Sequence, residues 1–129
     1  YLDKERFGYG YIENIQYESW VNDGINKIYK YLENIIELSK QNNFKTYIVY
    51  YPSALEVLEN INYKQSKHYT MLKNFSDKNK ITLIDAADNF FANINGNKNY
   101  IDNFIKCDAH WNKNGHKNIT NSVIEYIND

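Results

Sequence analysis

The chain has little of what would place it in several common protein classes. Its 129 residues include one cysteine, Cys107, and one proline, Pro52. A single cysteine excludes an intrachain disulfide framework and does not identify the redox compartment. No apolar run approaches the ~18 residues of a membrane span. The formal net charge of -1, from 15 basic and 16 acidic residues, argues against nucleic acid or a polybasic membrane surface as a partner.

The remaining composition is that of a single globular domain at most. A chain of this length can hide roughly two-thirds of its unfolded surface. It is rich in aromatic residues, including 13 tyrosines. We expect these to fill the core and its rim; the alternative is a sugar-stacking platform formed by Tyr50, Tyr51 and residues 7–11. The chain begins at Tyr1 and not at Met, which is consistent with a processed or truncated piece.

Hydrophobic periodicity predicts alternating helices and strands. Apolar residues recur at helical spacing and predict a long helix over residues 19–41, with Ser19 as its N-cap. Residues 1–18 have no clean period and are predicted to be an irregular lead-in. Two short β-branched runs, 45–52 and 81–85, predict buried parallel strands. Further helices are predicted over residues 53–60, 66–78 and 86–94, followed by a polar loop over 93–99. After Asn112, a last helix is predicted, with a buried stripe of Ile119, Val123, Ile124 and Ile127.

This order of elements predicts an α/β fold with a parallel sheet, as one domain over residues 1–129 or as part of one. Only two strands are evident. A two-stranded parallel sheet with both edges open is a poor domain. Either the irregular segments hide a strand, or the chain is the C-terminal part of a larger sheet, and we favour the second prediction.

The segment CDAHWNKNGHKNI, residues 107–119, carries the clearest chemical pattern. Asp108 and His110 are two apart, so their side chains point the same way on an extended backbone. A carboxylate that accepts a hydrogen bond from one ring nitrogen fixes the tautomer, and the other nitrogen can then take a proton from a nucleophile. Two alternatives remain. In one, Asp108 caps a turn and His110 packs locally. In the other, Asp108, His110 and His116 bind zinc, although their spacing matches no ligand pattern.

The stretch D-A-H-W-N-K-N-G-H-K resembles the C-terminal block of SGNH (GDSL-type) hydrolases, which often reads D-x-H-W-N-x-x-G-H in bacterial carbohydrate-esterase-like members. The upstream order agrees, with a long helix, then YIVYYPS (47–53), then ITLID (81–85). The resemblance covers about residues 20–127. It implies a three-layer α/β/α domain with a parallel, flavodoxin-like sheet, and it makes Asp108 and His110 the Asp and His of a catalytic triad. It also implies that Trp111 and Asn112 shape the turn, and that Gly115 lets the last helix approach the sheet.

The nucleophile block of that family, Gly-Asp-Ser, does not occur in this chain. Ser53 is the only serine directly after a predicted strand. It lacks the glycine-flanked turn of a nucleophile, so a helix N-cap is the better interpretation. We therefore expect the chain to be inactive alone.

The resemblance implies a serine esterase or acyltransferase acting on O-acyl (acetyl) esters of carbohydrate, with Asp108 and His110 supplied here and the serine from outside. It implies no metal and no organic cofactor, and it favours an extracytoplasmic or cell-envelope location in a bacterium. The alternative function is a non-catalytic carbohydrate-binding or assembly module that retains the SGNH fold.

Overall fold

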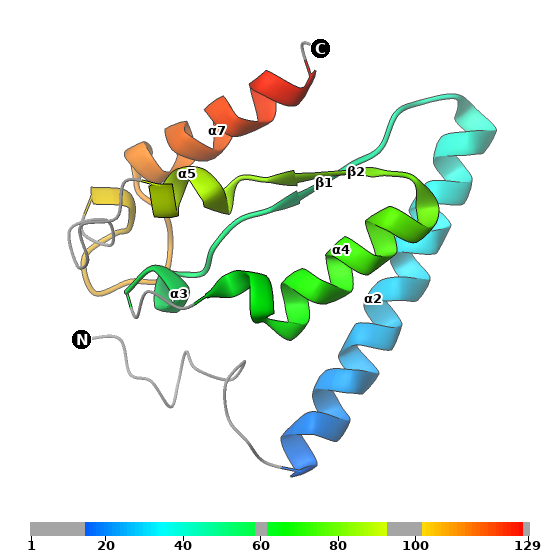
Figure 1. Ribbon diagram of the computed structural model, residues 1–129, viewed down its shortest axis with the longest axis horizontal. Helices are drawn as coiled ribbons and strands as arrows, with labels where there is room; N and C mark the ends of the chain where they lie inside the picture. The colour runs from blue at the N-terminus through cyan, green and yellow to red at the C-terminus, as the bar shows by residue number, and fades with distance from the viewer. Residues whose placement is uncertain (1–14, 59–61, 93–101, 128–129) are drawn as a thin grey trace.

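The computed structural model describes residues 15–58, 62–92 and 102–127, and these form a mixed α/β fold that is mostly helical (Figure 1). The predicted alternation of helices and strands is confirmed within these ranges. The candidate platform at residues 7–11 and the predicted loop over 93–99 lie outside the described residues. In chain order the elements are α2 (Ile15–Asn42), β1 (Tyr47–Tyr50), α3 (Ala54–Leu58), η1 (Tyr63–Gln65), α4 (Lys67–Asn79), β2 (Thr82–Asp85), α5 (Ala87–Ala92) and α7 (Lys113–Ile127).

Strands β1 and β2 form a two-stranded parallel sheet, as the two apolar runs predicted. The register pairs Tyr47 with Thr82 and Tyr50 with Asp85. Since the strands are parallel, their carboxyl ends meet at one edge, where the backbone N–H of Ala86 donates to the carbonyl oxygen of Tyr50 (2.9 Å). Open α/β sheets place their ligands at such an edge.

The core lies between the strands and the helices on either side of them. Ile36 of α2, Ile48 of β1 and Phe75 of α4 form one buried cluster. A second cluster joins α3 to Phe104, with the half-buried Ile119 of α7 against it. Figure 1 shows α7 across the strands from α4 and α2. Helix α4 begins one residue after the predicted start, because the Ser66 hydroxyl accepts the backbone N–H of Tyr69 as an N-cap.

The first predicted helix differs from the structure at its start. Helix α2 begins at Ile15, so Ser19 lies inside it and is not an N-cap, and residues 15–18 are helical and not irregular. Its apolar stripe is only partly covered, since Ile36 is buried whereas Ile28 and Ile35 are exposed. The helix continues through the residues before Ser19, because extending an existing helix is more favourable than ending it at an N-cap there.

The predicted buried stripe of the last helix is wrong at its C-terminal end. Ile124 and Ile127 are 48% and 55% exposed. The described sheet has two strands of four residues, and these give α7 too little surface to cover its last turns.

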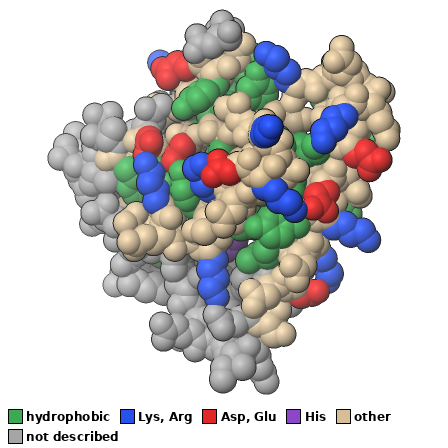
Figure 2. Space-filling view, turned by 45° about the vertical axis from the view of Figure 1, so that its right-hand side comes forward, with side chains coloured by type: hydrophobic (Ala, Val, Ile, Leu, Met, Phe, Trp, Pro, Cys, Tyr) green, Lys and Arg blue, Asp and Glu red, His purple; other side chains and the backbone are tan. Residues whose placement is uncertain are grey.

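The surface mixes charges of both signs. Figure 2 shows Lys side chains beside Asp and Glu on the face drawn, with hydrophobic side chains between them. Several neighbours form ion pairs, such as Lys73 with Asp77 on α4 and Lys27 with Asp23 on α2. Among the described helices, none combines the length and the apolar character that crossing a membrane requires.

Candidate functional site

The Asp108–His110 pair lies on a short loop that leads into α7. Phe104 and Trp111 form an antiparallel bridge that closes this loop. Inside it, the backbone N–H of Ile105 donates to the carbonyl oxygen of His110, and that of Asp108 donates to the carbonyl oxygen of Ile105, both at 2.9 Å. These hydrogen bonds stabilise the conformation of the loop backbone, and the backbone in turn positions the side chains of Asp108 and His110.

The structure shows the predicted contact between the two side chains. Oδ1 of Asp108 lies 2.5 Å from Nδ1 of His110 and also accepts the backbone N–H of His110 at 2.9 Å. The expectation of an extended backbone is wrong, because residues 108–110 form a bend. Aspartate often bonds the backbone N–H two residues ahead, and this local turn brings the ring of His110 to the same oxygen.

The hydrogen bond defines which ring nitrogen carries the proton. The bond from His110, together with the backbone N–H bond, holds the pKa of the Asp108 carboxyl below its usual range. The carboxylate is therefore ionised at neutral pH and can only accept, so Nδ1 of the neutral ring donates to it. This leaves the lone pair of Nε2 for an incoming proton. The His110 side chain is 85% exposed, which makes that nitrogen accessible.

Asn112 joins the two ends of the loop. Its Nδ2 donates to the carbonyl oxygens of Asp102 (3.0 Å) and Phe104 (3.1 Å). Its Oδ1 accepts the backbone N–H groups of Asn114 (2.8 Å) and Gly115 (3.1 Å). The predicted N-cap of the last helix is thus confirmed. Both donors and both acceptor positions of the side chain are used, so it ties the loop to α7.

Gly115 allows this loop and α7 to lie in contact. A Cβ atom at this position would be 2.3 Å from the carbonyl oxygen of Asn103 and 3.0 Å from Cβ of Trp111. Only glycine therefore fits without moving one of the two backbones. The close contact is with Asn103, directly before the loop, and it positions the backbone that carries Asp108 and His110.

A groove with a volume of about 460 Å³ runs beside His110. It is lined by the residues after β1 on one side and by the loop and α7 on the other: Tyr51, Pro52, Ser53, Ala54, Leu55, Ala109, His110, Trp111 and His116. The rings of Tyr51 and Trp111 meet edge to face with centroids 4.3 Å apart, and His116 packs edge to face on Trp111 at 5.5 Å. The structure thus places His116 at the same groove as His110.

Ser53 lines this groove but acts as a helix cap. Its hydroxyl accepts the backbone N–H of Glu56 (3.2 Å), and the Glu56 carboxylate accepts the backbone N–H of Ser53 (2.7 Å). This reciprocal pair is a capping box. The hydroxyl of Tyr50 donates to the same buried carboxylate at 2.8 Å. The predicted N-cap role of Ser53 is confirmed.

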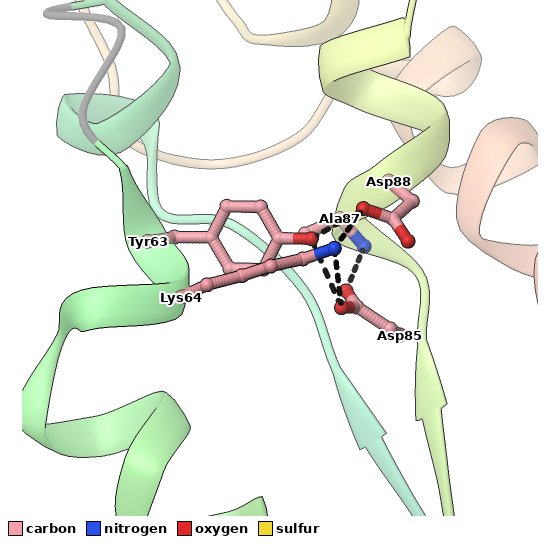
Figure 3. Close-up of polar contacts among 5 residues, drawn as sticks. All are labelled: Tyr63, Lys64, Asp85, Ala87 and Asp88. Carbon is pink, nitrogen blue, oxygen red and sulfur yellow. Dashed lines mark hydrogen bonds and ion pairs between the residues drawn. The ribbon is translucent and has the colours of Figure 1, made fainter.

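A second polar cluster at the carboxyl end of the sheet was not predicted from the sequence (Figure 3). The Tyr63 hydroxyl lies 2.6 Å from Asp88 and 2.9 Å from Asp85, and Lys64 lies 2.9 Å from Asp88. Burial, and then the bonds to the two carboxylates, raise the pKa of Tyr63 well above its usual value. Asp85 also accepts the backbone N–H of Ala87 and so caps α5. The cluster fastens η1 to the end of β2. The only signal for it in the sequence was Asp85 as the last strand residue.

The alternative zinc site is not assembled. Within residues 15–58, 62–92 and 102–127, no three His, Cys, Asp or Glu side chains gather closely enough to hold a metal ion. His110 and His116 share the groove, whereas His68 is exposed on α4.

Comparison with known proteins adds no relative, since no protein family, no curated protein and no solved structure matches this chain.

Proposed function

We propose that this chain supplies the acid–base pair of an SGNH-type serine esterase or acyltransferase acting on O-acyl (acetyl) esters of carbohydrate. The observation that carries the proposal is the contact between Asp108 and His110 at 2.5 Å, with the imidazole exposed at the edge of a groove. This is the arrangement of a general base held by a carboxylate. The extracytoplasmic location belongs to the same proposal.

Each residue has a defined chemical role in this mechanism. Nε2 of His110 removes the proton from a serine hydroxyl as its oxygen attacks the acyl carbonyl carbon. The tetrahedral intermediate collapses, the bond to the alcohol breaks, and Nε2 returns the proton to the leaving alkoxide. A water or an acceptor alcohol then repeats these steps on the acyl-enzyme. Throughout, the Asp108 carboxylate orients the ring and stabilises the imidazolium.

The nucleophilic serine comes from outside this chain in our proposal. Ser53 lines the groove, but its hydroxyl caps α3 and it is not in a glycine-flanked turn. We also propose that the full domain is a three-layer α/β/α fold in which the parallel sheet continues beyond β1 and β2. Its support is the apolar surface left exposed on both long helices, at Ile28 and Ile35 of α2 and Ile127 of α7.

Two polypeptides of different length test this proposal. The 129-residue chain should not hydrolyse p-nitrophenyl acetate faster than its His110→Ala variant. A polypeptide that adds the preceding coding sequence should contain Gly-Asp-Ser, and a fluorophosphonate should label that serine. Hydrolysis by the 129-residue chain above the variant, or a preceding sequence with no such serine, would overturn the proposal.

A non-catalytic carbohydrate-binding or assembly module is the second candidate. The observation that favours it is Tyr51, a large aromatic residue exposed beside His110. Such a module would bind sugar although the longer polypeptide contains no nucleophilic serine. The wild-type polypeptide and its His110→Ala variant would then both lack esterase activity.

A further inference from the structure

We propose that the groove beside His110 is a subsite for the neutral ring of a sugar, with Tyr51 and Trp111 as its aromatic walls. This rests on the proposed function, because it assigns residues to the alcohol portion of the ester. The volume of about 460 Å³ is within the usual range for a small-molecule site and exceeds what a single ring needs.

The lining of the groove favours a neutral ligand. None of the nine described residues that line it is Lys, Arg, Asp or Glu. A charged substrate group bound there would lose hydration without gaining an opposite charge from any of these nine residues, which is costly. Imidazoles, a hydroxyl and aromatic rings remain as the groups that meet the ligand.

The aromatic walls form a corner. The planes of Tyr51 and Trp111 are 80° apart. Tyr51 is 53% exposed, although the preceding Tyr50 is buried with its hydroxyl bonded to Glu56. The buried Pro52 restricts the backbone that carries Tyr51. Aromatic rings have a large apolar surface with an electron-rich face, so they suit the C–H faces of a sugar ring.

Polar groups at the rim suit the hydroxyls of the same ring. The Ser53 oxygen accepts from Glu56, and in the described part of the chain its hydrogen has no acceptor. His116 is exposed and is held by its edge-to-face contact with Trp111. A sugar offers apolar faces and hydroxyls around its edge, and thus matches both sets. An acyl chain would match the rings alone, because it has no groups that exchange hydrogen bonds with Ser53 or His116.

Binding to simple glycosides tests the subsite without turnover. The probes are the methyl glycosides of glucose, galactose, mannose and N-acetylglucosamine, with neutral hexanamide as the acyl-chain probe, in saturation-transfer NMR on the 129-residue chain. At least one glycoside should bind. Tyr51→Ala should weaken its affinity by about threefold to tenfold, which corresponds to the loss of one aromatic contact. Tyr31→Ala is the matched control, because Tyr31 is an exposed aromatic residue on α2. Thermal melts establish that both variants are folded.

Binding of none of the four glycosides, binding of hexanamide alone, or equal effects of the two substitutions would overturn the subsite. These results are separable from the proposed function, because binding needs no serine. Glycoside binding by a longer polypeptide that has no esterase activity would support the subsite and overturn the esterase. Esterase activity without glycoside binding would support the esterase and overturn the subsite.

Discussion

Alanine substitution at two helical glycines should have opposite effects on stability. Replacing glycine by alanine inside a helix gains up to about 1 kcal/mol from backbone propensity alone. At Gly24 of α2 the new Cβ would meet nothing within 4 Å. Gly24→Ala should therefore stabilise the fold by close to the full propensity gain.

Gly115→Ala should destabilise the fold, because the new Cβ would lie 2.3 Å from the carbonyl oxygen of Asn103. That oxygen accepts the backbone N–H of Asn112 at 3.0 Å, so it cannot move freely. Overpacking of this kind costs about 1–3 kcal/mol, and loosening the Asn112 bonds adds about 1 kcal/mol. After the propensity gain, we expect a net loss of about 2 kcal/mol.

Urea unfolding and thermal melts followed by circular dichroism measure this difference. The two variants should differ by about 3 kcal/mol, which is roughly 10 °C in Tm for a domain of this size. If Gly115→Ala is as stable as the wild type, then α7 does not lie against the segment before the loop. The stabilised loop backbone that we describe as positioning His110 would then be wrong.

Three further outcomes are expected. Asn112→Asp keeps the helix cap but sets a carboxylate against two carbonyl oxygens; it should cost about 2 kcal/mol in urea unfolding and more than Asn118→Asp, and equal losses would contradict the bridging role. Glu56→Ala removes the carboxylate that accepts from the buried Tyr50 hydroxyl and from the backbone N–H of Ser53, and it should cost about 2–3 kcal/mol, whereas Glu37→Ala on the surface of α2 should change stability by less than about 0.5 kcal/mol. Burial and the bond to Asp85 raise the pKa of Tyr69 to about 12. The folded state therefore favours its protonated phenol, and this contribution is complete below the unfolded pKa of about 10 and is lost as pH rises towards 12. Tyr69→Phe should reduce the loss of stability in this alkaline range, and an unchanged alkaline unfolding profile would refute that.

Local signals predicted those parts of the fold that depend on neighbours in sequence. The predicted caps at Ser53 and Asn112 follow from side chains that bond backbone groups two or three residues ahead. The burial of Ile124 and Ile127 was wrong for the opposite reason. Periodicity identifies which face of a helix is apolar, but the number of strands available decides how much of that face is covered.

The candidate site shows the same division. The contact of Asp108 with His110 is local, and its spacing predicted it, although a bend and not an extended strand produces it. The contact of Tyr51 with Trp111 joins residues 60 positions apart, and the Tyr63 bond to Asp85 spans 22 positions. No periodic pattern connects such pairs, because the folding of the chain alone brings them together.

The most direct test of the acid–base role is the steady-state kinetics of a polypeptide that includes the preceding coding sequence. We compare its hydrolysis of an acetylated sugar with that of the His110→Ala and His68→Ala variants, since His68 is exposed on α4. His110→Ala should lower kcat/KM by about a thousandfold or more, as removal of a triad member does, and His68→Ala should leave it unchanged. A His110→Ala enzyme within about threefold of the wild type, with the serine still required, would contradict the role of His110 as the general base.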